Sequence, residues 1–272
     1  MIEGMSRKPF AGLRAVAMLA VAVGMIGQVS VSVQTPYVLI NHAVAGNHGG
    51  SPALWIVRAT DHFDIYYQRH HERALDDIAR EAERAYARVS FDLRHDLARK
   101  MPLILFRTER ELPRDRREAS EIVRASGAAP DRDHLLLALE PSDGRATALV
   151  HELTHQFAFE IIPLSTGAPT WAQEALPDHE AGTWNSSDLV TLREAAAIGA
   201  IPAVERFADS DRLWGHALLD FVVAEYGREG LRRYLTALRN TSSPADSRAT
   251  FGITASDFDR AFQTYVSTRF NR

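Results

Sequence analysis

The chain has 272 residues, no cysteine and a formal net charge of −4 at pH 7. The lack of cysteine excludes disulfides, thiol catalysis and cysteine-ligated metal sites, and the weakly acidic balance gives no reason to expect nucleic-acid binding. The charged fraction of 24% and the apolar fraction of 46% are those of an ordinary globular protein. The length allows one large domain or two small ones.

The N-terminus has the pattern of an export signal. An apolar run at 15–27 follows three basic residues, Arg7, Lys8 and Arg14. A basic region followed by a short apolar stretch is typical of a secretory signal. The run is shorter than the roughly 20 residues that span a bilayer, but apolar residues continue to position 33, so an uncleaved anchor through 15–33 is the alternative. We expect residues 1–33 to be a signal peptide or membrane anchor and the protein to be secreted or otherwise extracytoplasmic.

The rest of the chain places strands early and helices late. Residues 34–54 are rich in Gly, Asn and Pro and are predicted to be a linker, which leaves 55–272 as the folded domain. Hydrophobic periodicity then predicts, in order, a strand at 55–67, a helix at 71–96, a strand at 101–106, a helix or lid at 108–126 and a strand at 135–139. From residue 147 onward the pattern is mostly helical. This order predicts an α+β fold.

A His-Glu-Leu-Thr-His pentapeptide stands at 151–155 in a stretch without Pro or Gly, which favours a helix. Positions i and i+4 of a helix share a face, so His151 and His155 can direct two imidazoles at one metal ion. Glu152 is placed to reach a water beside that ion. Two such histidines with an adjacent glutamate are the arrangement of a zinc metallopeptidase. The alternative is a helix whose histidines are ordinary surface or core residues.

Catalytic zinc sites normally have three protein ligands and one open position. Glu174, which lies 19 residues after His155, follows a turn and a second helix start at Pro169 and Thr170. It is the expected third ligand, with Glu160 and Glu180 as alternatives. The predicted cofactor is therefore one Zn²⁺ per chain, held by His151, His155 and Glu174.

These residues resemble the gluzincin clan of metallopeptidases, and more narrowly the bacterial peptidase MA-like domains. The resemblance rests on His-Glu-x-x-His, eighteen intervening residues, and the Glu of Trp171-Ala172-Gln173-Glu174. Looser matches extend it over about residues 55 to 268, at 61–67, 81–86, 226–231 and 251–262. It implies a zincin-like fold, with a small N-terminal mixed-sheet lobe, a mainly helical C-terminal lobe and an active-site cleft between them. The strand at 133–140 would then form the cleft edge and pair with substrate.

The resemblance also implies roles for residues after the motif. Asp178 would orient His151, although a solvated surface aspartate is an equal alternative. His216 is the first candidate for stabilising the oxyanion, and Tyr226 is the second. His179 is expected at the surface. Two departures from the family pattern stand here: Ala175 replaces the usual glycine, and Pro177 predicts a kink or an early end of the helix.

The expected activity is hydrolysis of peptide bonds by a metal-activated water, with Glu152 as general base and a peptide or protein as substrate. One alternative is a catalytically inactive zincin-like domain that binds peptide or protein partners outside the cytoplasm. Another is hydrolysis of a non-peptide amide by the same groups. Cleavage specificity and oligomeric state do not follow from the sequence.

Overall fold

The computed structural model describes residues 40–41, 54–112, 134–140, 143–240 and 250–271. The predicted signal or anchor at 1–33 lies outside these residues, as does most of the predicted linker. Of the predicted helix or lid at 108–126, only the segment to residue 112 is described, and it contains a short 3₁₀ turn, Glu109–Glu111. Among the helices of the described part, none is both long enough and apolar enough to cross a bilayer.

The N-terminal part of the domain begins with a β-hairpin. The prediction of one strand over 55–67 is wrong, because β2 (Leu54–Ala59) and β3 (Phe63–Tyr67) pair antiparallel. Thr60 makes the turn: its backbone N–H donates to the Phe63 carbonyl at 2.8 Å, and its hydroxyl accepts from the Phe63 N–H at 3.1 Å. A two-residue strand, β1 (Ile40–Asn41), pairs with β2 inside the predicted linker.

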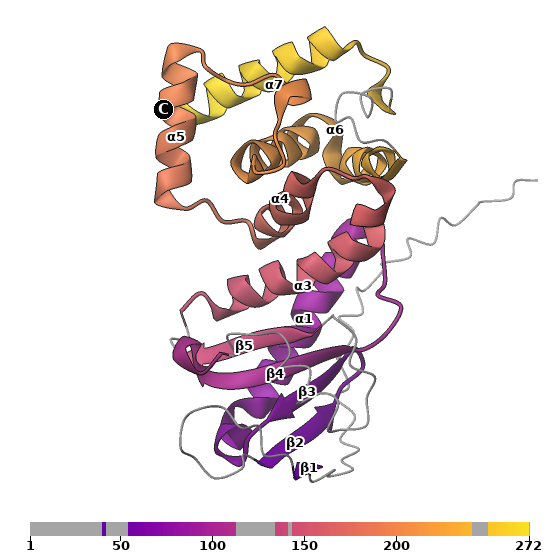
Figure 1. The fold of residues 1–272 in the computed structure, drawn as a ribbon, viewed down its shortest axis with the longest axis vertical. Coiled ribbons are helices and arrows are strands. Elements are labelled where there is room, and N and C mark those ends of the chain that lie inside the picture. The colour runs from indigo at the N-terminus through magenta and orange to yellow at the C-terminus, as the bar shows by residue number, and fades with distance from the viewer. Residues whose placement is uncertain (1–39, 42–53, 113–133, 141–142, 241–249, 272) are drawn as a thin grey trace, which may run out of the picture. The chain divides into compact units, whose positions relative to one another are not determined.

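The sheet continues with two parallel strands (Figure 1). Helix α1 (Leu75–Leu93) connects β3 to β4 (Met101–Thr108), and β5 (Leu135–Glu140) pairs with β4 at the edge. The predicted helix at 71–96 is too long at both ends. Its first residues form a 3₁₀ turn, Arg69–Ala74, and Arg94 ends the helix in the left-handed region with φ 49°.

The two faces of the sheet are buried differently. One face packs with α1 and the following helices into the main core, which contains Ile65, Leu103 and Leu135 from neighbouring strands. The other face carries a smaller cluster made by Trp55, Tyr66, Ile104 and Phe106. Alternation along the strands therefore decides which face each side chain covers.

Helix α3 (Arg145–Ile161) follows β5 and carries the motif histidines. Its apolar stripe of Leu149, Leu153 and Phe157 is fully buried, because residues four apart share a face and this face meets the core. His151 and His155 lie on the other side of the helix and are only partly buried. Burial of one stripe thus fixes the direction in which the motif side chains point.

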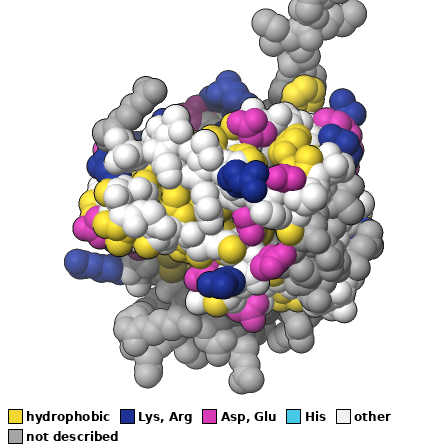
Figure 2. Space-filling model, turned by 90° about the horizontal axis from the view of Figure 1, so that it is seen from above, with side chains coloured by type: hydrophobic (Ala, Val, Ile, Leu, Met, Phe, Trp, Pro, Cys, Tyr) yellow, Lys and Arg dark blue, Asp and Glu magenta, His cyan; other side chains and the backbone are white. Residues whose placement is uncertain are grey.

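The remainder is helical and comprises α4 (Thr170–Ala181), α5 (Ser186–Ile198), α6 (Arg212–Asn240) and α7 (Ala255–Phe270). Helix α6 is broken at Gly227, where φ is 67° and ψ is −177°. The α+β prediction is confirmed: a small mixed sheet of four strands, extended by β1, precedes a mostly helical part. Figure 2 views the helical end, where basic and acidic side chains intermingle on the face shown.

Candidate metal centre

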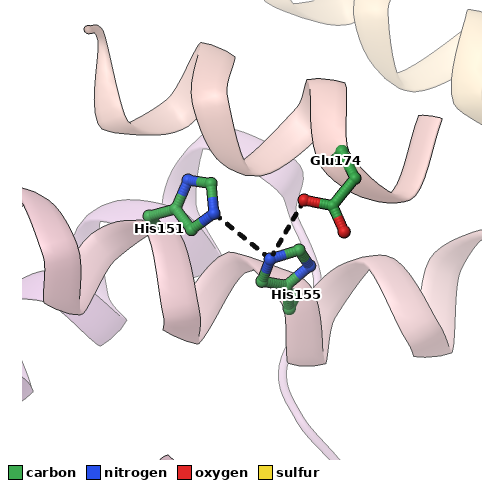
Figure 3. Close-up of side chains that lie close together, drawn as sticks. All are labelled: His151, His155 and Glu174. Atoms are coloured by element: carbon green, nitrogen blue, oxygen red, sulfur yellow. Dashed lines mark hydrogen bonds and ion pairs between the residues drawn. The ribbon is translucent and has the colours of Figure 1, made fainter. Parts of the chain in front are cut away.

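Helices α3 and α4 bring three possible metal ligands together (Figure 3). The Nε2 atoms of His151 and His155 are 3.2 Å apart, and Nε2 of His155 is 3.7 Å from Oε2 of Glu174. One ligand atom from each of the three residues lies within 4.8 Å of the others. Glu174 comes from the neighbouring helix α4, so the site lies between α3 and α4.

These separations suit a small tetrahedral cation. Ligand atoms about 2.05 Å from a tetrahedral zinc lie about 3.3 Å from one another, which is close to both observed distances. Burial lowers the pKa of His155, which favours the neutral imidazole that binds metals. Two imidazole nitrogens facing each other with a carboxylate beside them form a donor set that a cation satisfies. The residues present therefore fit zinc.

Asp178 lies one turn beyond Glu174 on α4 and contacts the His151 ring on the side away from His155. Its Oδ1 is 3.2 Å from Nδ1 of His151, the nitrogen that does not face His155. The hydrogen bond that His151 donates to Asp178 raises the pKa of His151 against the effect of burial. Asp178 is 7% exposed, so it is not a solvated surface residue. Its geometry is that of a carboxylate that orients a metal-binding histidine.

Asp178 is in turn held by α6. Burial alone would raise the pKa of Asp178, but the hydrogen bond to His151 and the charge of Arg212 hold it below its usual value. Arg212 pairs with both Asp178 and Asp188, the second at 3.1 Å. The carboxylate therefore stays ionised and fixed, as orientation of His151 requires.

Replacing Asp178 with Asn is expected to weaken zinc binding about 10–100-fold, as loss of such an outer carboxylate usually does. The amide keeps the shape of the side chain but loses the charge that orients His151. Asp188→Asn is the matched control, because it also faces Arg212 but does not contact His151. Competition with a zinc chelator measures both variants. Equal zinc affinities in the two variants would show that Asp178 does not support zinc binding at this site.

Pro177 lies inside α4, and the helix continues past it to Ala181, so the prediction of an early end is wrong. A proline has no N–H, so the carbonyl of Gln173, four residues earlier, receives no helical hydrogen bond. Helix α4 therefore continues with one backbone hydrogen bond fewer, in the turn that carries Glu174 and Asp178.

Glu152 is exposed on α3 beside the candidate ligands. Its negative charge contributes to the raised pKa of His151 and partly offsets the lowering of the His155 pKa by burial. The alternative carboxylates have other partners: Glu160 pairs with His95 at 2.7 Å, and Glu180 is fully buried and pairs with Arg228 at 2.6 Å. Among the carboxylates of the described residues, Glu174 is the one that groups with His151 and His155.

The structure argues against an oxyanion role for His216. Its side chain is 2% exposed, and its ring stacks on Trp184 with centroids 3.7 Å apart and an interplanar angle of 2°. Burial lowers the pKa of His216 to about 4. An imidazole covered in this way cannot meet a substrate carbonyl. The second candidate, Tyr226, stacks on Phe251 at 3.9 Å.

The sequence pattern did not predict which residues surround His216. His179, expected at the surface, is 9% exposed, and its Nδ1 lies 2.6 Å from Oδ1 of Asp220. His216 and Asp220 are four residues apart on α6, and this i, i+4 spacing was the signal available in the sequence. Arg212, the partner of Asp178, had no comparable signal because its contact joins distant segments.

Comparison with known proteins gives no further assignment. No family model matches the chain, and neither the curated proteins nor the solved structures yield a significant match.

Proposed function

We propose that this chain is a zinc metallopeptidase of the gluzincin type, with a zincin-like arrangement of a sheet lobe and a helical lobe. The observation that carries the proposal is the convergence of His151, His155 and Glu174, with Glu152 next to the first histidine on the same helix. A zinc ion in this position would polarise a substrate carbonyl and lower the pKa of a bound water to about 7.

The residues around the site would have separate roles in the reaction. Glu152 accepts a proton from the attacking water and returns it to the leaving amine. Its exposed position suits this role, because the carboxylate must reach both solvent and substrate. Asp178 holds the imidazole of His151 in the orientation that leaves its Nε2 atom toward the shared site.

Strand β5 supplies a place for an extended substrate. It is the last strand in the sheet order and pairs with β4 on one side, so its other edge is not used by a strand of the described residues. The next described helix after it is α3, which carries the motif. An extended peptide adding to this edge would lie beside the motif helix. We therefore propose a peptide or protein substrate, and the N-terminal sequence pattern supports action outside the cytoplasm.

Metal removal tests the activity directly. The full chain is incubated with a diverse mixture of unfolded peptides, before chelation, after chelation and after zinc is added back, and new termini are identified by mass spectrometry. We expect cleavage that disappears with the chelator and returns with zinc. A zinc-loaded protein that cleaves none of the peptides would contradict peptidase activity and favour either a binding domain or a different amide substrate.

A further inference from the structure

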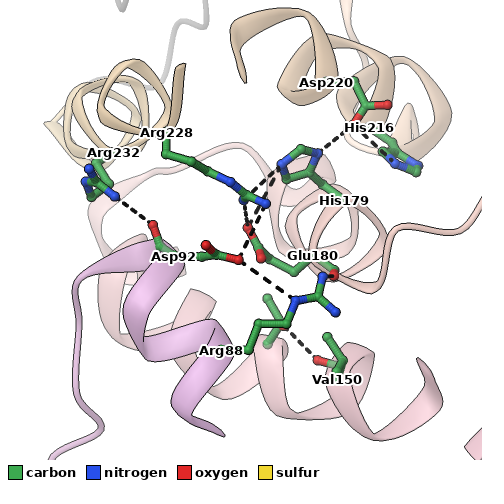
Figure 4. A network of polar contacts seen from close by, with 10 residues as sticks. Arg88, Asp92, Val150, His179, Glu180, His216, Asp220, Arg228 and Arg232 are labelled. Carbon is green, nitrogen blue, oxygen red and sulfur yellow. Dashed lines mark hydrogen bonds and ion pairs between the residues drawn. The ribbon is translucent and has the colours of Figure 1, made fainter. Parts of the chain in front are cut away.

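A second group of possible metal ligands lies between α4 and α6 (Figure 4). One ligand atom from each of His179, His216 and Asp220 lies within 4.8 Å of the others. His216 and Asp220 are one helical turn apart on α6, and His179 faces them from α4. The first centre is built in the same way, from an i, i+4 pair on one helix and a third residue on the next.

The burial of this cluster and the 3.7 Å between Oδ1 of Asp220 and Nε2 of His216 suit a bound cation. Oδ1 of Asp220 is 2.6 Å from Nδ1 of His179, a hydrogen-bond distance that would lengthen to about 3.3 Å when both atoms bind one ion. The side chains of His179, His216 and Asp220 are 7%, 2% and 22% exposed. These three side chains are largely withdrawn from water, and a divalent cation could be a polar partner to all of them at once.

The surrounding side chains resemble the outer shell of a metal site. The other ring nitrogen of His179, Nε2, is 3.9 Å from Oε1 of Glu180. Glu180 is fully buried, and its Oε2 has no hydrogen-bond partner in the part of the chain that the structure describes. Metal-bound histidines usually donate their second N–H to such a carboxylate. Trp184 stacks on His216 and so holds the ring of this ligand in place.

Arg228 is a cation that lies beside this cluster. Its guanidinium is 3.4 Å from Nε2 of His179 and 2.6 Å from Oε1 of Glu180. It therefore meets the side of the His179 ring that is opposite to Nδ1, and it offsets the charge of Glu180. The negative charge of Asp220 is therefore the one that a bound metal would offset.

We propose that His179, His216 and Asp220 form a second, structural site for a divalent transition metal, with zinc as the first candidate. Two imidazoles and one carboxylate are the ligand set that zinc and its neighbours in the first transition row accept. On binding, the metal takes the place of the proton between Nδ1 of His179 and Asp220, and that proton moves to Nε2 of His179, so the ring stays neutral. Water completes the coordination.

This metal would connect the two helices that support the first centre. Helix α4 carries Glu174 and Asp178, and helix α6 carries Arg212, which pairs with Asp178. A metal bridging His179 on α4 to His216 and Asp220 on α6 would hold these helices together. Its role would be to stabilise this packing, since the cluster is covered by Trp184 and offers little access to a substrate.

The test is zinc binding by the full chain with His151→Ala and His155→Ala, which removes the first centre and leaves the second. After chelation, the variant is titrated with zinc, and zinc per chain and thermal unfolding are measured. We expect one zinc per chain and a higher Tm when zinc is present. If the variant binds no zinc, the second site is contradicted. One zinc in both this variant and the unaltered chain would support the second site and contradict the first, so the two failures are distinguishable.

Asp220→Asn in the otherwise unaltered chain provides an independent check. The amide has the same shape but no charge, so we expect this variant to hold one zinc fewer than the unaltered chain. His95→Gln is the matched control, because His95 also pairs with a carboxylate, Glu160, but lies outside both clusters. An Asp220→Asn protein that retains every zinc would overturn the proposal. If this variant does not fold, the titration of the His151→Ala/His155→Ala protein still decides.

Discussion

Glu152→Gln is expected to keep the zinc content unchanged and to lower kcat on a cleaved peptide by about 10²–10⁴-fold, the usual contribution of a general base. The amide cannot accept a proton from water, but it has the size of the carboxylate and is not one of the three ligands. Because Glu152 is exposed, the replacement also leaves the core untouched. Zinc content and steady-state kinetics on the same preparation measure both effects.

Glu160→Gln is the control for this variant. Glu160 is two turns further along α3 and pairs with His95, so its loss removes a carboxylate from the same helix without touching the candidate centre. We expect nearly full activity from it. Equal kcat values for the Glu152 and Glu160 variants would show that Glu152 is not the base, whatever the zinc content.

Gly215→Ala is expected to destabilise the protein, because α4 and α6 approach each other closely at this point. A Cβ atom at position 215 would lie 2.3 Å from Cε3 of Trp171 and 2.9 Å from Cβ of Ala175. Overpacking of this kind costs about 1–3 kcal/mol. Trp171 and Ala175 flank Glu174 on α4, so displacement of this helix should also weaken zinc binding. Thermal or denaturant unfolding and zinc competition measure the two losses.

An exchange of Ala and Gly at an exposed position of the same helix is the control for Gly215. In an exposed helix interior, alanine is about 1 kcal/mol more favourable than glycine, so propensity alone predicts that Gly215→Ala stabilises. At Ala224, an exposed position of α6, the reverse change to Gly should destabilise by that amount. A stabilised Gly215→Ala protein would show that the two helices are not packed as closely as the structure places them.

Local patterns in the sequence were sufficient to predict the two helices that carry the candidate centre. The i, i+4 spacing of His151 and His155 predicted a helix with both rings on one side, and α3 has this form. The helix start at Pro169 and Thr170 also placed Glu174 on a second helix. These features depend on residues close in sequence, for which spacing determines direction.

The missed features depend on contacts between distant segments. Thr60 turns the chain between β2 and β3, but a threonine between two apolar stretches is an ordinary strand residue in a pattern. The stacking of Trp184 on His216 and the pairing of Arg212 with Asp178 are set by packing of α4 on α6. Periodicity does not report such packing, so it did not show that His216, the first candidate for stabilising the oxyanion, is buried.

Pro177 shows a local rule that tertiary packing overrides. A proline in a helix interior removes a hydrogen bond, which predicted an interruption of α4. The helix continues to Ala181, and most of its residues, Pro177 included, are buried against the rest of the domain.

The measurement that tests the central claim most directly is zinc per chain, by elemental analysis, for the full protein and for its His151→Ala/His155→Ala variant after identical chelation and zinc loading. We predict that the variant holds one zinc fewer and loses all metal-dependent peptide hydrolysis, while its circular dichroism spectrum is unchanged. Equal zinc content in the two folded proteins would contradict a metal centre at His151, His155 and Glu174.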